Sequence, residues 1–201
     1  MKRDFAFALP VKAHQVPTGP DWIHEIKHDG YRLKVIRAGA RVQLTTRNGL
    51  DYTKRYPWIV RDALKLDADR FVLDGEAVVL NLHGLSDFEA LHSGQYNAVV
   101  RFYAFDMLEG EGVDLSRRPL ADRKVELAKL LDGFPQDGGI HIAPYERGEI
   151  GTDLFKHGCL LGLEGIVSKH LDRAYKVGRC DHWVKVKNPN HPAYSRVQDA
   201  F

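Results

Sequence analysis

A lysine, an Asp-Gly pair and an arginine lie close together near the start of the chain, in the stretch Lys27–Arg32. Asp-Gly permits a tight turn between two strands, and such a turn would bring Lys27 and Arg32 near each other at the mouth of a sheet. A lysine held near other cations in a poorly solvated cleft has a lowered pKa and can act as a nucleophile. The alternative is a surface hairpin whose lysine has no special role, and this stretch alone favours neither.

Two later segments carry charged residues at strand spacing. Glu164–Lys169 has a carboxylate and a lysine at the two ends of a short apolar run. Trp183–Lys187 alternates strictly, so Lys185 and Lys187 point to one face and the valines beside them to the other. This pattern fits a strand that binds phosphate. It fits equally an amphipathic edge strand whose lysines protect against aggregation.

Carboxylates and aromatic residues fill two segments in the middle of the chain. Leu73–Glu76 is a carboxylate-bearing run inside an apolar stretch, and Phe102–Asp106 is rich in aromatic residues. An aromatic run in a strand is typical of a hydrophobic core, and by itself it does not indicate a platform for stacking a base.

Short elements, mostly strands, must position these residues. The segments around Ala38-Gly39-Ala40 alternate apolar and polar residues, which predicts a hairpin. Because hairpin-like connections outnumber βαβ units, the predicted fold class is α+β, with mostly antiparallel sheets and flanking helices. The predicted strands are Trp22–Lys27, Tyr31–Ala38, Arg41–Thr46, Phe71–Leu80, Ala98–Met107, Ile140–Pro144, Glu164–Lys169 and Trp183–Lys187. The predicted helices are Tyr52–Leu66, Leu120–Leu131 and Thr152–Leu161.

The composition is that of a globular protein with basic ends. Of 201 residues, 44% are hydrophobic and 28% are charged, which excludes a disordered chain. No apolar run approaches the ~18 residues of a membrane span. Residues 1–60 carry a net charge of +6, residues 61–146 carry −7 and residues 147–201 carry +3. If the basic ends meet in space, they would offer a face to a polyanion. The two cysteines form no metal-spaced cluster, so a reducing cytosol is expected.

Taken together, these segments resemble the adenylation (nucleotidyltransferase) domain of ATP-dependent DNA ligases. That superfamily also includes RNA ligases and mRNA capping enzymes. The resemblance covers roughly residues 20–188 and is closest to bacterial end-joining ligases, through Trp22–Lys27 and Trp183–Pro189. The segments that resemble family motifs, in family order, are Lys27–Arg32, Thr46–Gly49, Leu73–Glu76 with Phe105–Asp106, Glu164–Lys169 and Trp183–Lys187.

The resemblance implies a covalent mechanism. Lys27 would attack the α-phosphate of ATP to give a lysyl-AMP and pyrophosphate, within a catalytic set that also includes Asp29. Lys185 and Lys187 would hold the phosphate, spread its developing charge and help to keep Lys27 neutral. AMP would then pass to a DNA 5′-phosphate, and a 3′-hydroxyl would displace it to seal the strand.

Further residues take roles from the same resemblance. Glu25 would contact the adenine amino group, Phe105 would stack on the adenine, Glu76 and Arg32 would hold the ribose, and Lys169 would lie at the phosphate end of its strand. Arg47 would bind phosphate, expected to be the 5′-phosphate of the nick. Glu164, with Glu76 and Asp29, would hold Mg²⁺ or Mn²⁺. The residues expected to contact DNA are Arg32, Arg47, Lys54 and Arg55.

The expected organisation is a single adenylation domain, residues 1–201, without further domains. Only about 14 residues follow the fifth motif, too few for an OB-fold, and no helical DNA-binding domain precedes Pro20. Both a natural minimal protein and a truncated one would be consistent with this organisation. The expected partner is nicked double-stranded DNA in the bacterial cytosol or nucleoid, with room for a partner protein that supplies DNA clamping.

Other functions remain open at the level of sequence. The same covalent chemistry serves RNA ligases and capping-type guanylyltransferases, although Thr46–Gly49 favours a DNA ligase. A non-catalytic module that binds nicks is the alternative from another class. Without an OB-fold, sealing of a nick that is already adenylylated is the step expected to be most competent.

Overall fold

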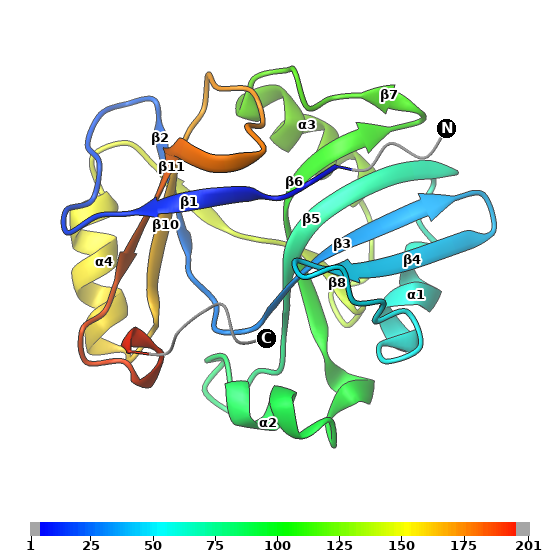
Figure 1. Ribbon diagram of the computed structural model, residues 1–201, viewed down its shortest axis with the longest axis horizontal. Helices are drawn as coiled ribbons and strands as arrows, with labels where there is room; N and C mark the ends of the chain where they lie inside the picture. Colours follow the sequence, from blue (N-terminus) through cyan, green and yellow to red (C-terminus); the bar gives the residue numbers. More distant parts are fainter. Residues whose placement is uncertain (1–4, 196–201) are drawn as a thin grey trace. The chain divides into compact units, whose positions relative to one another are not determined.

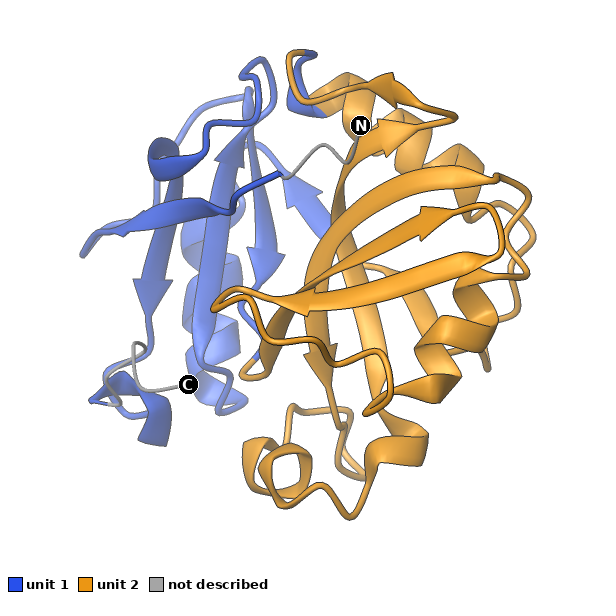
Figure 2. Cartoon of the chain, turned by 45° about the vertical axis from the view of Figure 1, so that its right-hand side comes forward, with its two compact units in different colours: residues 1–28, 118–120, 144–201 blue, residues 29–117, 121–143 orange. Residues whose placement is uncertain are grey.

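The computed structural model describes residues 5–195, and the chain divides into two compact units (Figure 2). Unit 1 comprises residues 1–28, 118–120 and 144–201, and unit 2 comprises residues 29–117 and 121–143. The boundary between His28 and Asp29 falls inside the first motif. The basic first residues of the chain and the end of the tail that follows the fifth motif lie outside the described range.

Unit 1 is built on a five-stranded sheet with the order β1-β11-β10-β2-β9. The strands pair antiparallel except for β1 and β11, which are parallel. A helix, α4, packs on one face of this sheet (Figure 1). There the ring of His24 lies 2.4 Å from the position that a Cβ on Gly151 would take. The elements are β1 (Ala8–Lys12), β2 (Trp22–Ile26), β9 (Tyr145–Arg147), α4 (Gly151–Leu160), β10 (Gly165–His170), β11 (Gly178–Lys187) and the 3₁₀ turn η2 (Pro192–Tyr194).

Unit 2 is built on a sheet with the order β4-β3-β5-β6-β7, and β8 pairs in parallel with β6. Its elements are β3 (Tyr31–Ala38), β4 (Arg41–Thr46), α1 (Pro57–Ala63), β5 (Arg70–Val78), α2 (Phe88–Ser93), the 3₁₀ turn η1 (Asn97–Val99), β6 (Arg101–Gly110), β7 (Val113–Asp114), α3 (Leu120–Leu130) and β8 (Ile140–Ile142). No helix within residues 5–195 is long and apolar enough to cross a membrane.

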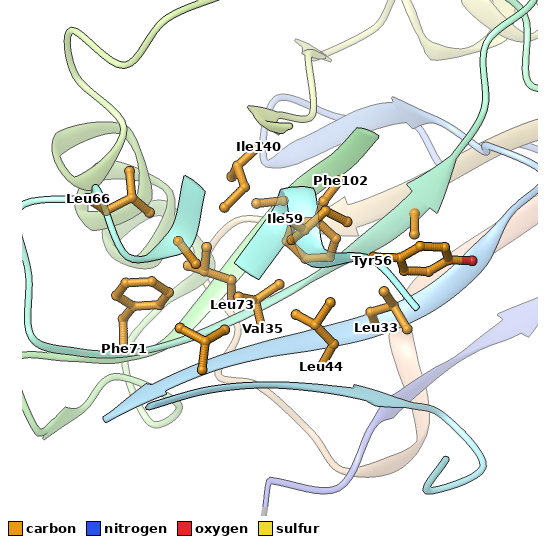
Figure 3. Close-up of a cluster of buried hydrophobic side chains, with 14 of the residues drawn as sticks. Leu33, Val35, Leu44, Tyr56, Ile59, Leu66, Phe71, Leu73, Phe102 and Ile140 are labelled. Carbon is orange, nitrogen blue, oxygen red and sulfur yellow. The ribbon is translucent and has the colours of Figure 1, made fainter. Parts of the chain in front are cut away.

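The core of unit 2 lies against one face of this sheet (Figure 3). Leu33 and Val35 on β3, Leu73 on β5 and Phe102 on β6 are fully buried, and Ile59 of α1 packs onto the same cluster. Each such side chain contributes about 1.5–3 kcal/mol on burial. Because strand side chains alternate, this core leaves the intervening residues of β3 and β5 on the other face of the sheet.

A buried ion pair fixes α3 to β6. Arg123 donates from Nε and Nη2 to the two carboxylate oxygens of Asp106, at 2.7 and 2.8 Å, and both side chains are inaccessible to solvent. Such a pair tolerates burial because two parallel hydrogen bonds satisfy both charged groups. Asp106 therefore stabilises unit 2 from inside the motif Phe105–Asp106.

The predicted fold class and the hairpin around Gly39 are confirmed. The sheets are antiparallel except for two parallel pairings, and β3 and β4 have the predicted bounds. The helix predicted over Tyr52–Leu66 is shorter, because it begins only at Pro57. The short strands β1, β7 and β9 and the helix α2 carry too few residues for a periodic signal, and they were not predicted.

The turn predicted at Asp29-Gly30 does not join two paired strands. Strand β2 pairs with β10 and β9, whereas β3 pairs with β4 and β5 in the other sheet. The prediction of a hairpin that carries Lys27 and Arg32 is therefore wrong. Asp-Gly allows a tight turn but does not require one, and here Lys27 continues the ladder with β10 through a hydrogen bond to the Gly165 carbonyl.

Asp62 generates a test of the unit 2 fold. Its buried carboxylate accepts hydrogen bonds from the Gly139 N–H at 2.7 Å and from Lys65 at 2.8 Å. Burial alone would raise the pKa of Asp62, but these two bonds outweigh it and hold the pKa below its ordinary value of 3.8. The stabilisation is therefore complete above that value and is lost as the pH falls through the lower pKa of the folded state.

We expect Asp62→Asn to lower the free energy of unfolding at pH 7 by about 1–2 kcal/mol, because a charged hydrogen-bond acceptor becomes neutral. The difference from the parent protein should shrink and vanish as the pH falls below about 3.8. Chemical denaturation across pH measures this, with Asp67→Asn on the exposed loop as the control. A deficit that persists unchanged at acid pH would contradict the assignment.

Candidate nucleotidyl-transfer site

One face of the unit 1 sheet carries a row of charged side chains. In the register of the sheet, Val167 on β10 lies between Glu25 and Lys185, and Gly165 lies beside Lys187. Because side chains alternate along a strand, residues two apart share a face. The charged residues that β2, β10 and β11 place on this face include Glu25, Lys27, Lys169, Lys185 and Lys187.

Glu164 connects two of these lysines at the end of β10. The Nζ of Lys27 donates to Oε2 of Glu164 at 2.6 Å, and the Nζ of Lys187 lies 3.2 Å from Oε1. The Glu164 side chain is 2% exposed, whereas Lys27 remains 14% exposed. Two cations thus share one buried carboxylate, and Lys27 is the member that solvent or a ligand reaches most easily.

A second ion pair lies further along the same face. The Nζ of Lys169 is 2.6 Å from Oε2 of Glu25 and 4.2 Å from the centre of the Trp183 ring. Both charged side chains are almost fully buried. Removing either partner would leave a buried charge without compensation, which typically costs about 3–5 kcal/mol.

The backbone around Glu164 is locked by two neighbours. Gly165 has φ +146°, and a Cβ there would lie 2.1 Å from the Val186 carbonyl oxygen, so only glycine fits. Asn188 donates its backbone N–H to the Glu164 carbonyl at 2.8 Å and its side-chain amide to the Leu163 carbonyl at 3.0 Å. These contacts fix the backbone from which the Glu164 carboxylate extends.

Lys185 and Lys187 lie on an interior strand. β11 pairs with β10 on one side and with β1 on the other, so the interpretation of Trp183–Lys187 as an edge strand is wrong. Strand β1 (Ala8–Lys12) pairs in parallel with β11 and covers its outer edge. The sequence did not predict this pairing, because Pro10 lies in the segment and proline is uncommon in paired strands. Lys187 also donates to the Ala193 carbonyl at 2.9 Å, so η2 helps to hold it.

On the opposite face of β2, His24 makes two contacts through its ring nitrogens. Its Nδ1 lies 2.8 Å from the Ser168 hydroxyl on β10, and its Nε2 lies 2.9 Å from the Gly148 carbonyl, to which it donates. These bonds tie β2 to its neighbour and to the loop before α4. They stiffen the strand whose other face presents Glu25 and leads to Lys27.

His28 follows the candidate nucleophile directly. Burial lowers the pKa of His28 to about 4, against the opposing effect of Glu25. At neutral pH its ring is therefore uncharged and adds no further cation beside Lys27.

In unit 2, the guanidinium group of Arg32 contacts the carboxylate of Asp74 and the ring of Phe105. It donates from Nε and Nη2 to Asp74 at 3.0 and 2.8 Å, and its guanidinium carbon lies 5.3 Å from the centre of the Phe105 ring. Glu76 lies directly across from Arg32 in the β3–β5 register. The structure thus brings three residues predicted to bind nucleotide, namely Arg32, Glu76 and Phe105, onto the face of this sheet away from the core.

Arg47 lies in a tight turn beside Arg32. The turn is closed by the hydrogen bond from the Gly49 N–H to the Thr46 carbonyl at 3.0 Å, with Gly49 at φ +82°. The Arg47 N–H donates to the Arg32 carbonyl at 3.3 Å, so the two arginines are neighbours at the same end of β3 and β4. The backbone of this turn thus places a second arginine next to Arg32, and arginine is a residue type that suits an anionic ligand.

The other two residues predicted to contact DNA differ in their surroundings. Lys54 is exposed. Arg55 lies over the rings of Tyr31, Tyr52 and Tyr56, with 4.8–5.6 Å between its guanidinium carbon and the ring centres, and it donates to the Leu91 carbonyl at 3.3 Å. Arg55 therefore fastens the end of α2 to this aromatic cluster.

The residues predicted to hold a metal come from both units. Glu164 belongs to unit 1, and Asp29 and Glu76 belong to unit 2. Within residues 5–195 no three His, Cys, Asp or Glu side chains gather as a metal-binding group. Glu164 alone supplies a hard oxygen donor beside Lys27, and Mg²⁺ commonly uses one or two carboxylates together with substrate phosphates. The donor chemistry of Glu164 suits Mg²⁺, and since its two oxygens lie 2.6 and 3.2 Å from the Nζ atoms of Lys27 and Lys187, a cation would take the place of Lys27 on this carboxylate.

Comparison with known proteins decides the family. The family model described as "ATP dependent DNA ligase domain" matches residues 10–187. The chain belongs to this family. The match includes every motif segment on which the resemblance rests.

The relatives found are larger than this chain. It is 38% identical over 177 residues to the multifunctional non-homologous end joining protein LigD of Pseudomonas aeruginosa, which covers 86% of this chain and 21% of that protein. It is 36% identical over 185 residues to a probable DNA ligase of Streptomyces griseus, covering 84% of this chain and 36% of that protein. The chain therefore spans about a fifth to a third of the length of these two relatives.

Solved structures confirm the α+β adenylation fold. The ligase domain of LigD from Mycobacterium tuberculosis superposes with a TM-score of 0.75 at 31% identity, covering 90% of this chain and 60% of that one. A mycobacterial DNA ligase D complexed with ATP and MES superposes with a TM-score of 0.74, also at 31% identity and with the same coverage.

Two residues that shape the site were not predicted from the sequence. Asp74, which orients Arg32, lies within Leu73–Glu76, where alternation places it on the same side as Glu76. Asn188, which holds Glu164, follows the fifth motif directly, but nothing in its residue type indicates a partner 24 positions away in the chain.

The two faces of β11 should respond differently to substitution. Val186 is 3% exposed on the face away from the lysines, so Val186→Asp should destabilise the protein by several kcal/mol through an unpaired buried carboxylate. Lys185→Ala should leave the fold intact and impair nucleotidyl transfer. Thermal unfolding and an adenylylation assay measure the two effects, with Val177→Asp in an exposed loop as the control. A Lys185→Ala protein with normal transfer would contradict this assignment.

Proposed function

We propose that this chain is the nucleotidyl-transferring core of an ATP-dependent DNA ligase, with Lys27 as the nucleophile. The observation that carries the proposal is the arrangement of Lys27 and Lys187 on the two oxygens of the buried Glu164. Family membership and the likeness to a DNA ligase D complexed with ATP support ATP as the substrate. The related bacterial end-joining protein and DNA ligases support DNA as the second substrate.

In the proposed first step, the Nζ of Lys27 forms a bond to the α-phosphorus of ATP while the bond from that phosphorus to the bridging oxygen of pyrophosphate breaks. Because only a neutral amine attacks, Lys27 must pass a proton to a base and separate from Glu164 before its nitrogen bonds to phosphorus, and the Glu164 carboxylate, 2.6 Å away, is placed to accept that proton. Lys185 and Lys187, on the same face, would balance the negative charge that develops on the phosphate. Pyrophosphate leaves, and AMP remains on Lys27.

The proposed second and third steps act on a nick. The 5′-phosphate oxygen of DNA takes AMP from Lys27, and the neighbouring 3′-hydroxyl then displaces AMP to form the phosphodiester. Arg47, at the turn beside Arg32, is proposed to hold the 5′-phosphate. Mg²⁺ bound through Glu164 would neutralise phosphate charge and favour departure of the leaving group.

The proposed ligand contacts of the remaining residues follow the family resemblance. Phe105 and Glu25 would recognise adenine, and Arg32 with Glu76 would hold the ribose, with Asp74 keeping Arg32 in place. Lys169 would support Glu25, and Asp29 and Glu76 would assist the metal. Lys54 and Arg55 are proposed to add charge near the DNA. We propose that residues 1–201 act as one catalytic domain.

Loss of Lys27 should abolish the covalent adduct, because the reacting nitrogen is removed. We expect no labelled protein when Lys27→Ala is incubated with Mg²⁺ and ATP radiolabelled at the α-phosphate, whereas Lys156→Ala, an exposed lysine on α4, should label normally. A parallel reaction with labelled GTP distinguishes a ligase from a guanylyltransferase. On a pre-adenylylated nick the same variant should keep more of its sealing activity, since AMP is already transferred. Undiminished labelling of Lys27→Ala would refute the proposal.

Arg47 should determine the preference for a phosphorylated nick. We expect fluorescence anisotropy to show tighter binding when the nick carries a 5′-phosphate, and Arg47→Ala to remove most of this difference. With three to five phosphate contacts, the slope of log affinity against log salt should be about −3 to −5. Arg41→Ala, at the opposite end of β4, is the matched control. Equal preference for the phosphate in Arg47→Ala would argue against this role, and salt-independent binding would argue against the few-contact interface.

A further inference from the structure

Unit 1 contains a cavity at the end of the sheet away from Lys27. The cavity has a volume of about 670 Å³, within the size range of small-ligand sites. Trp22 begins β2 and pairs with His170, which ends β10, and both line the cavity. The five residues of β2 span roughly 16 Å, so this cavity is separate from the lysine face around Glu164.

One side of the cavity is aromatic. The indole of Trp22 meets the His170 ring edge to face, with 5.2 Å between the ring centres and 70° between the planes. His170 is oriented by the Asp172 N–H, which donates to its Nδ1 at 3.3 Å. Both rings are only partly buried, so each keeps surface on which a flat ligand can pack.

The rest of the lining is mostly polar and positively charged. Arg173 and Lys176 are exposed on the loop between β10 and β11, and Lys176 pairs with Asp181 at 3.0 Å. His182 donates to the Ala174 carbonyl, and burial holds the pKa of His182 below its ordinary value, which keeps this ring neutral at pH 7. Two cations against one carboxylate leave the cavity with a positive charge.

We propose that this cavity binds one unpaired nucleotide of a nucleic-acid strand, with the base against Trp22 and His170 and the phosphate near Arg173 and Lys176. Aromatic rings combined with cations are the pattern that binds single strands without sequence preference. The choice of a nucleic acid as ligand rests on the proposed ligase function, but the binding itself does not require Lys27. A ligase with such a site would hold the unpaired end of a strand at a distance from the nick.

The test measures binding of a short, fluorescently labelled oligothymidylate by anisotropy. Trp22→Ala should weaken binding about tenfold through the loss of stacking, and Trp22→Phe should restore most of it. The double charge reversal Arg173→Glu with Lys176→Glu should also weaken binding about tenfold, and should reduce the salt slope by roughly 0.7 for each lost phosphate contact. The matched control is Lys156→Glu, on α4 of the same unit.

Circular dichroism shows which variants are folded, and the exposed charge reversals test the proposal even if Trp22→Ala does not fold.

The outcomes separate this inference from the proposed function. If the charge reversals bind oligothymidylate no differently from Lys156→Glu, the cavity is not a nucleotide site. Competition by free thymidine monophosphate at equal concentration would show a mononucleotide site and overturn the strand-binding proposal. The same variants should form the lysyl-AMP adduct normally. Failure of the parent protein to form that adduct would refute the ligase proposal while leaving the binding result to stand.

Discussion

The structure of the candidate site depends on one buried carboxylate shared by two lysines. Glu164 lies between Lys27 and Lys187, at 2.6 and 3.2 Å, in a position almost closed to solvent. A buried carboxylate is tolerated only with its charge compensated, and a lysine amine reacts only when it is neutral. The same contact therefore holds Lys27 at the position from which it is proposed to attack, and it must separate before the amine can react.

The arrangement follows from strand register. The alternation of side chains in β2, β10 and β11 places the lysines and Glu25 on one face, and α4 with His24 supports the other face. Gly165 is the point at which the strands approach too closely for any side chain. Unit 2 shows the same design, since the core lies on one face of its sheet while Arg32, Asp74 and Glu76 come from the alternate positions.

Sequence patterns predicted the parts of this design that repeat along the chain. The hairpin of β3 and β4 was correct to the residue, because alternation and a glycine turn are local signals. Local signals failed where pairing partners are distant in the sequence. Asp29-Gly30 predicts a hairpin turn that the strands do not form, and the alternation in β11 does not show that β1 pairs along its edge. The resemblance supplied the candidate residues, but the ion pairs of Glu164 and the clamp of Asp74 on Arg32 arise from three-dimensional contacts that spacing does not encode.

The central claim is that Lys27 is the residue that carries AMP. Peptide mapping by mass spectrometry, after incubation of the intact chain with ATP and Mg²⁺, tests it most directly. The account predicts a single AMP modification, located on Lys27. An AMP group found instead on Lys169, Lys185 or Lys187 would contradict it.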